Sequence, residues 1–199
     1  DGDLDPVADA SDCPAVSLSG SFNTAHPAPR MRLSSTTPNA LPPSSATFAM
    51  LPPDLKQRVR ASFDRAAVTY DAAAVVQRQV CDRLLESLTS AIPAPAHILD
   101  AGCGTGYGTR CLRSRYPAAH ITGVDFAPSM LEIAGEVADA CFAADIEKLP
   151  FSEHRFDLWW SSLTIQWCDA QTVFGEAARV LKPGGRLALS TLGPATFFE

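Results

Sequence analysis

The stretch H-I-L-D-A-G-C-G-T-G-Y-G, from His97 to Gly108, decides the fold of this chain. Its short apolar run ends on Asp100, and glycines follow at alternate positions: Gly102, Gly104, Gly106 and Gly108. A helix-compatible stretch comes next. Glycine has no Cβ, so a turn built from glycines lets a ligand approach the main chain closely. The order of strand, glycine turn and helix therefore predicts a parallel sheet whose edge binds a nucleotide-like ligand.

Strand-like and helix-like stretches alternate after this turn. We predict strands over residues 98–100, 121–125, 141–145, 156–161 and 186–191, and helices over 107–115, 128–138 and 172–181. The K-P-G-G run at 182–185 predicts a tight turn. This alternation is typical of the α/β class, here a Rossmann-like parallel sheet with helices on both faces.

Two amphipathic helices are expected before the sheet. Asp54 can cap the first, whose apolar residues recur at helical spacing from Leu55 to Tyr70. Asp71 is expected to cap the second helix. The buried face of that second helix is predicted to consist of Val76, Val80, Leu84 and Leu88.

Composition and charge restrict the domain count and the function class. Residues 1–50 are rich in Pro, Ser, Thr and Ala, which predicts a disordered or non-native extension before a single domain at 51–199. A net charge of −6 disfavours general nucleic-acid binding. No apolar run approaches the roughly 20 residues that span a bilayer, and the first residues lack the basic region of a signal peptide.

The spacing of cysteines and histidines argues against a metal site. The six cysteines include no C-x-x-C pair, and the four histidines show no metal-ligand spacing. Reduced thiols in a cytoplasmic protein are therefore the expected state.

Three carboxylates end three consecutive predicted strands: Asp100, Asp125 and Asp145. Asp125 follows the glycine turn at about the distance typical of a residue that accepts hydrogen bonds from ribose hydroxyls; the alternative is an Asp that only bonds to the next helical turn. For Asp145 the alternative is a solvated loop residue. Because parallel strands end at the same edge of a sheet, we expect all three carboxylates to line one ligand site.

A dinucleotide site is disfavoured by the spacing of the glycines. The G-x-G-x-x-G motif would place its third glycine at position 107, which is Tyr107 here. With Asp100 before the turn, the motif instead resembles the first motif of the class I S-adenosylmethionine-dependent methyltransferases.

This resemblance implies a set of cofactor-binding residues. Asp145 would accept a hydrogen bond from the adenine amino group, and Ile146 would pack on the adenine ring. The full set of residues that the resemblance assigns to S-adenosyl-L-methionine is Asp100, Gly102, Gly104, Gly106, Asp125, Phe126, Met130, Asp145, Ile146, Ser162 and Leu163.

Three further segments narrow the resemblance. They are F-D-R-A-A-V-T-Y-D-A-A-A-V-V-Q-R-Q at 63–79, W-S-S-L-T-I-Q-W-C at 160–168 and S-T-L-G-P-A-T-F at 190–197. Together they are similar to the malonyl-acyl-carrier-protein O-methyltransferases of early biotin synthesis, over roughly residues 55–199. The sheet of the superfamily has seven strands, so we expect this chain to stop after the fifth and to leave that strand with an unpaired edge.

The family implies an acceptor and a mechanism. A free malonyl carboxylate, on acyl carrier protein or coenzyme A, would attack the sulfonium methyl group. That carboxylate is ionised near neutral pH, so no general base is needed. Tyr70 is the candidate catalytic residue, with its hydroxyl directed to the acceptor or to the methionine end of the cofactor; the alternative is that Tyr70 only packs. The residues also leave open a different small-molecule methyltransferase of this fold and a cofactor-binding fragment without activity.

A basic surface is expected because acyl carrier proteins are generally acidic. The candidates lie on the two leading helices: Lys56, Arg58, Arg60, Arg65, Arg78 and Arg83. The alternative is a solvated helix face on which four neighbouring acidic residues partly balance the charge: Asp54, Asp64, Asp71 and Asp82.

Overall fold

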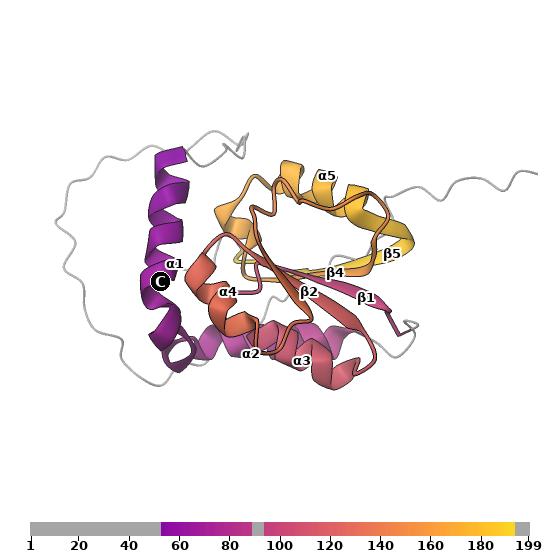
Figure 1. The fold of residues 1–199 in the computed structure, drawn as a ribbon, viewed down its shortest axis with the longest axis horizontal. Coiled ribbons are helices and arrows are strands. Elements are labelled where there is room, and N and C mark those ends of the chain that lie inside the picture. Colours follow the sequence, from indigo (N-terminus) through magenta and orange to yellow (C-terminus); the bar gives the residue numbers. More distant parts are fainter. Residues whose placement is uncertain (1–52, 89–93, 194–199) are drawn as a thin grey trace, which may run out of the picture. The chain divides into compact units, whose positions relative to one another are not determined.

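The computed structural model describes residues 53–88 and 94–193 (Figure 1). The segment 1–50, predicted to be an extension, lies outside these residues. The helices are α1 (Pro53–Ala73), α2 (Val75–Ser87), α3 (Tyr107–Arg115), α4 (Pro128–Ala134), the 3-10 helix η2 (Ile165–Trp167) and α5 (Ala170–Val180). The strands are β1 (His97–Ala101), β2 (His120–Asp125), β3 (Ala140–Ala143), β4 (Phe156–Ser162) and β5 (Leu181–Ser190). None of the described helices is long and apolar enough to cross a membrane.

The five strands form one parallel sheet in the order β3-β2-β1-β4-β5. The Rossmann-like α/β prediction is therefore confirmed. The chain crosses from β3 over β2 and β1 to add β4, so the order reverses between β1 and β4. Ligands of such sheets bind at this reversal, outside the carboxyl ends of the strands.

Side chains of successive residues alternate between two apolar cores. On one face, Ile98 and Trp160 pack with residues of α2 and α3. On the other face, Leu99 and Trp159 pack with Val173 and its neighbours on α5. Figure 1 shows α2 and α3 on one side of the sheet and α5 on the other. Burial on both faces explains why the central strands read as nearly continuous apolar runs.

The junction between α1 and α2 differs from the prediction. Asp71 does not cap α2, which begins at Val75 without a side-chain cap. Its carboxylate instead accepts hydrogen bonds from the Thr105 hydroxyl and from Arg110 Nη2, the latter at 3.2 Å. Asp71 therefore ties α1 to the glycine turn and α3, a long-range contact that local spacing does not encode.

The buried face of α2 is also rotated from the one predicted. Val76 is 57% exposed. Ala74, Cys81 and Leu84 are buried, and Leu88 packs beside them. The predicted spacing correctly placed Leu84 and Leu88 on the buried face, but Val76, in the first turn of the helix, lies on the exposed face.

Several element ends differ from those predicted, among them those of β3, α4 and β5. Strand β3 stops at Ala143, so Asp145 lies in the loop after it. Helix α4 ends at Ala134 rather than at residue 138. The K-P-G-G run forms a bulge inside β5 instead of a turn before it, because Phe156 already pairs with Leu181 while Leu158 pairs with Arg186.

Gly106 begins α3 and packs against α4. Its φ is +84°, a left-handed conformation that favours glycine. A Cβ built there would lie 2.9 Å from Val137 Cγ2 and 3.0 Å from Ala134 Cα. This close approach requires glycine for two reasons, backbone conformation and space.

The substitution Gly106→Ala should destabilise the domain by about 2–4 kcal/mol, from left-handed strain and overpacking together. Gly104→Ala is the matched control, since Gly104 has φ +52° but no atom lies within 4 Å of the place that its added methyl group would take. That control should cost only about 1 kcal/mol of strain. Equal losses in urea unfolding would show that α4 does not restrict the Gly106 site.

Candidate functional site

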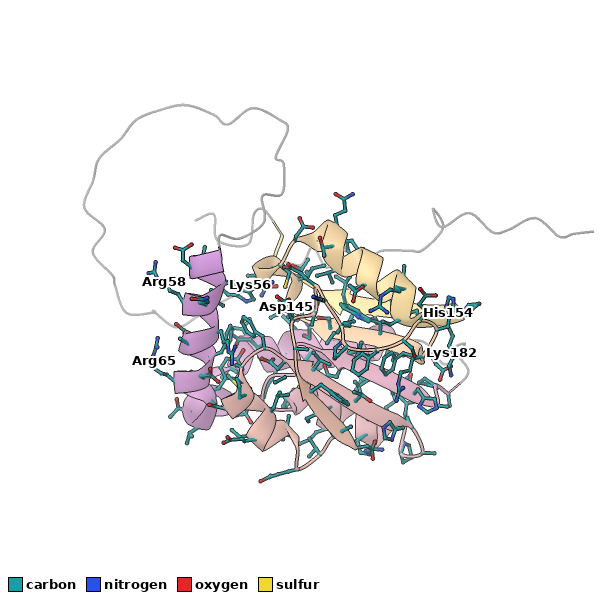
Figure 2. The ribbon with its side chains drawn as sticks, turned by 45° about the horizontal axis from the view of Figure 1, so that its top comes forward. Lys56, Arg58, Arg65, Asp145, His154 and Lys182 are labelled. Atoms are coloured by element: carbon teal, nitrogen blue, oxygen red, sulfur yellow. The ribbon has the colours of Figure 1, made fainter. Side chains whose placement is uncertain are left out.

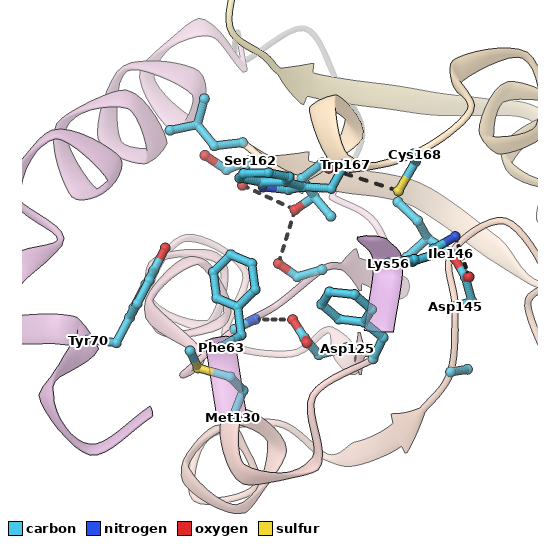
Figure 3. Close-up of a pocket in the computed structure, with 16 residues that line it drawn as sticks. Lys56, Phe63, Tyr70, Asp125, Met130, Asp145, Ile146, Ser162, Trp167 and Cys168 are labelled. Atoms are coloured by element: carbon cyan, nitrogen blue, oxygen red, sulfur yellow. Dashed lines mark hydrogen bonds and ion pairs between the residues drawn. The ribbon is translucent and has the colours of Figure 1, made fainter. Parts of the chain in front are cut away.

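A pocket opens at the carboxyl ends of the strands, where the sequence predicted it (Figure 3). Its empty space is about 610 Å³ and is continuous with solvent. Most of the predicted site residues line it: Tyr70, Gly102, Gly104, Asp125, Phe126, Met130, Asp145, Ile146, Ser162 and Leu163. Residues from α1, the glycine turn and the exits of three strands thus meet around one cavity.

Asp125 holds the glycine turn in place. Its Oδ2 accepts a hydrogen bond of 2.9 Å from the Gly104 amide, and its Oδ1 accepts one of 2.9 Å from the Ala127 amide. Burial raises the pKa of Asp125, and the amide donors oppose that rise. A carboxylate has about four acceptor sites, so Asp125 keeps lone pairs for hydroxyl donors of a ligand in the pocket.

A second pocket adjoins the first and shares Tyr70, Gly102 and Leu163 with it. Asp100 lines this second pocket rather than the first. It is 2% exposed, and its Oδ2 accepts a 2.7 Å hydrogen bond from the Thr109 hydroxyl. Burial raises the pKa of Asp100 to about 7, helped by the nearby charge of Asp125 and opposed by Thr109. A cationic group of a ligand would restore the ionised form.

Lys56 is a pocket residue that was expected on the surface. Its Nζ forms ion pairs with Asp145 Oδ2 and, at 2.8 Å, with Glu147 Oε1. Burial lowers the pKa of Lys56, but the two carboxylates outweigh it and the pKa is raised. Asp145, Glu147 and Cys168 offer ligand atoms within 4.8 Å of one another, yet the Lys56 ammonium group already forms ion pairs with both carboxylates.

Aromatic side chains line one side of the first pocket. Phe63 of α1 lies with its ring centroid 6.0 Å from Tyr70, 6.1 Å from Phe126 and 6.2 Å from Trp167. We call these four residues the aromatic cluster. Burial, together with Asp125 and Asp71, raises the pKa of Tyr70, so its hydroxyl stays protonated and can donate a hydrogen bond. Figure 3 shows that hydroxyl directed into the cavity.

The backbone is strained just after β4, at Leu163, which lines both pockets. Leu163 has φ +53°, which is unusual for a residue with a branched side chain. Its amide donates to Ser190 O at 2.9 Å, and its carbonyl accepts from Gln166 Nε2 at 2.6 Å. Ser162 Oγ lies 3.0 Å from Ser190 Oγ. The surrounding hydrogen bonds hold a conformation that costs of order 1–3 kcal/mol.

The structure bears on two predicted assignments. Gly106 lines neither pocket and packs against α4, and its contact with the cofactor stays a prediction. The six-residue basic surface is wrong in part, since Lys56 and Arg78 line the pockets. Figure 2 shows Lys56 directed at Asp145, whereas Arg58 and Arg65 extend from the opposite side of α1.

Sequence reasoning missed Lys56, Phe63 and Arg78 as pocket residues. Phe63 was recognisable only as part of an apolar stripe. Lys56 meets acids about ninety positions away in the chain, and no local pattern signals such a pair. Arg78 lies one residue after Gln77 on α2, and both line the second pocket.

The comparisons with known proteins agree with this geometry. A family model described as a methyltransferase domain matches residues 99–189, which span the strands and loops that build the site. Over residues 99–189 the chain is therefore similar to a methyltransferase domain. The reversal of strand order and the carboxylates at the sheet edge lie within this matched region.

Curated relatives of this chain share one description. A malonyl-[acyl-carrier protein] O-methyltransferase of Dechloromonas aromatica is 51% identical over 146 residues, covering 72% of this chain and 54% of that protein. One of Laribacter hongkongensis is 48% identical over 158 residues, covering 72% and 53%. The chain therefore spans about half the length of these relatives.

A solved structure from Thermotoga maritima, described as a SAM-dependent methyltransferase, is similar with a TM-score of 0.52 and 26% identity. The match covers 64% of this chain and 58% of that one. The shared region supports the Rossmann-like methyltransferase fold.

The buried carboxyl of Asp100 predicts a pH-dependent stability. Its folded pKa of about 7 lies above the ordinary 3.8, so the folded state binds more protons between these values and loses stability as pH rises. Asp100→Asn should remove this loss. Relative to the wild type, the variant should be about 2 kcal/mol more stable against unfolding at pH 7.5 than at pH 5.

Asp157→Asn provides a control with the opposite sign. Although burial opposes it, Lys182 and two backbone amides lower the pKa of Asp157. That variant should lose stability at neutral pH and approach the wild type as pH falls below about 4. A pH-independent effect of Asp100→Asn in urea unfolding would contradict the raised pKa of Asp100.

Proposed function

We propose that this methyltransferase domain serves the S-adenosylmethionine-dependent methylation of the free carboxylate of a malonyl group on acyl carrier protein. The observation that carries the proposal is the 51% identity to a protein described as a malonyl-[acyl-carrier protein] O-methyltransferase. The resemblance of the sequence to that family adds that the methyl ester enters biotin synthesis.

The residues of the two pockets fit the proposed cofactor. Asp125 offers acceptor sites to the ribose hydroxyls, and Phe126 and Ile146 offer apolar surfaces to the adenine ring. Asp145, held by Lys56, offers an acceptor to the adenine amino group. S-adenosylmethionine, when bound, supplies an electrophilic methyl group on a sulfonium. Gly104 has open space above its Cα, so the ligand can approach the main chain there.

The chain's contribution to the reaction is positioning and exclusion of water. The acceptor carboxylate is ionised near neutral pH, so no residue has to remove a proton from it. The Tyr70 hydroxyl, kept protonated, donates a hydrogen bond that orients the acceptor. The aromatic cluster provides the apolar wall of a dry site, in which a close approach of the reacting groups accelerates transfer.

A carrier protein would dock on the outer face of α1, which remains basic. Two of the three acids of α1 bind elsewhere in the domain: Asp64 accepts from the Ser129 amide at 3.0 Å, and Asp71 binds Thr105 and Arg110, whereas Asp54 is exposed at the start of the helix. Arg58 and Arg65 are exposed on the outer face (Figure 2).

We place the protein in the cytoplasm. The five cysteines in the described part of the chain are free thiols, a state that a reducing compartment maintains.

The direct test of the function uses the chain with S-adenosylmethionine and either malonyl-coenzyme A or acetyl-coenzyme A. Mass spectrometry should detect a methyl ester from the malonyl substrate and none from the acetyl substrate, which lacks a free carboxylate.

In a companion calorimetric measurement, Asp125→Ala should weaken binding of S-adenosylhomocysteine by about 1.5–3 kcal/mol through lost charge-assisted hydrogen bonds. Asp169→Ala, at the N-cap of α5 and outside the lining of both pockets, is the control. Unchanged affinity in a folded Asp125 variant would contradict the ribose assignment.

Docking is tested by reversing the charges of Arg58 and Arg65 to Glu. The Michaelis constant for malonyl-acyl carrier protein should rise severalfold, because long-range attraction to an acidic partner is lost. Turnover of malonyl-coenzyme A should stay within twofold, since that substrate has no protein surface. Reversal of Arg155 and Arg186 to Glu, two exposed residues outside α1, is the control matched in net charge. Equal effects on both substrates would place the docking surface elsewhere.

A further inference from the structure

Gln166 joins the turn after β4 to the end of β5 and lines neither pocket. It lies in the 3-10 helix η2, and its Nε2 donates a 2.6 Å hydrogen bond to the main-chain carbonyl of Leu163. Its Oε1 accepts a longer hydrogen bond of 3.5 Å from the Thr191 hydroxyl. A carbonyl oxygen can only accept, so the amide nitrogen of Gln166 has to face Leu163 and its amide oxygen Thr191.

Leu163 depends on this hydrogen bond because its own backbone conformation is unfavourable. Its φ of +53° lies in the left-handed region, where a residue with a branched side chain is strained. The residue is held from both sides, since its amide donates to Ser190 O at 2.9 Å and its carbonyl accepts from Gln166. The first bond joins two main-chain groups. Gln166 is therefore the side chain through which the sequence holds this conformation.

The strained residue lies where the two pockets meet. Leu163 lines both of them, as do Tyr70 and Gly102 of the glycine turn. The next residue, Thr164, packs on the same turn, because a Cβ added to Gly102 would collide with Thr164 Oγ1. A backbone change at Leu163 would therefore move a wall that both pockets share and loosen its contact with the glycine turn.

The short helix η2 also positions an aromatic residue of the first pocket. Trp167 follows Gln166 in η2, and its ring belongs to the aromatic cluster through its contact with Phe63. The Trp167 amide donates to Thr164 O at 3.0 Å, directly after the strained turn. Release of the turn at Leu163 would therefore also release the start of η2.

We propose that Gln166 is a positioning residue of the methyl-transfer site. By binding the Leu163 carbonyl, it keeps the backbone between β4 and η2 in the conformation in which Leu163 and Trp167 line the pockets. Without this bond, Leu163 leaves the left-handed region for part of the time, and a ligand binds only the fraction of chains that retain it. The proposal rests on the proposed function, because S-adenosylhomocysteine, the product form of the cofactor, is the ligand that reports it.

A purely structural role of Gln166 would have a different signature. A residue that only stabilises the fold changes the free energy of unfolding and leaves the ligand affinity of the folded chain unchanged. A positioning residue changes that affinity, because the lost conformational preference is subtracted from the free energy of binding.

Calorimetry with S-adenosylhomocysteine tests the proposal. Gln166→Met keeps a side chain of similar length but removes the donor, and it should weaken the ligand about three- to tenfold, the loss expected for one neutral hydrogen bond. Thr191→Val, the control, removes only the 3.5 Å contact at the other end of the amide and should change the affinity less than about twofold. Equal losses in the two variants would overturn the role of the Leu163 contact.

Gln166→Glu tests the hydrogen bond itself. An ionised carboxylate has no proton to donate to the Leu163 carbonyl, whereas the protonated acid has one. The carbonyl oxygen also raises the pKa of the introduced acid, because it disfavours the negative charge. Relative to the wild type at the same pH, Gln166→Glu should therefore recover affinity as pH falls from about 8 to about 5, and Gln166→Met should not. A pH-independent ratio for the Glu variant would overturn the proposal.

Hydrogen exchange in the chain without ligand provides a readout that needs no cofactor. Gln166→Met should speed exchange of the Leu163 amide about tenfold, because relaxation of the turn breaks its bond to Ser190 O. Protection equal to that of the wild type would overturn the proposal, as would unchanged affinity of the folded Gln166→Met variant in a chain that binds the ligand. Failure of the wild-type chain to bind S-adenosylhomocysteine would instead overturn the proposed function, and the role of Gln166 in it.

Discussion

The hydrogen bond from the Gly104 amide to Asp125 Oδ2 is the interaction on which the site depends. It joins the loop after β1 to the end of β2. The parallel register that pairs Asp100 with Gly123 brings these two segments to the same level of the sheet. Without the carboxylate, the loop amide would lose its partner, and the turn that borders both pockets would lose its fixed shape. One side chain thus sets the position of the loop and also offers its remaining lone pairs to a ligand.

The domain concentrates negative charge where folding alone would avoid it. Burial raises the pKa values of Asp100 and Asp125, which means that their ionised forms are disfavoured in the folded protein. Lys56 compensates Asp145 at the other end of the first pocket. Strain is added at Leu163, whose backbone is held in the left-handed region. Such local costs are expected where a ligand, rather than the fold, supplies the compensating interaction.

Local sequence patterns predicted the sheet because each strand is short, apolar and followed by a recognisable turn. The glycine motif and the carboxylates Asp100 and Asp125 identified the ligand edge, because strand ends in a parallel sheet converge whatever the rest of the chain does. Helix α3 was predicted at its observed bounds, since the glycine turn and the residues before Tyr116 mark both ends.

Contacts between distant segments could not be predicted in the same way. Asp71 has the residue type and position of a helix cap, but Thr105 and Arg110 draw its carboxylate to the glycine turn. Lys56 has the position of a surface cation, but the loop after β3 brings two acids to it. In both cases, tertiary packing overrode a correct local preference.

A crystal structure of the chain with S-adenosylhomocysteine would test the central role of Asp125 most directly. We predict that the ribose hydroxyls lie within hydrogen-bond distance of the Asp125 carboxylate while Gly104 keeps its bond to the same group. A nucleoside bound away from Asp125, or a complex in which the carboxylate leaves Gly104, would contradict it.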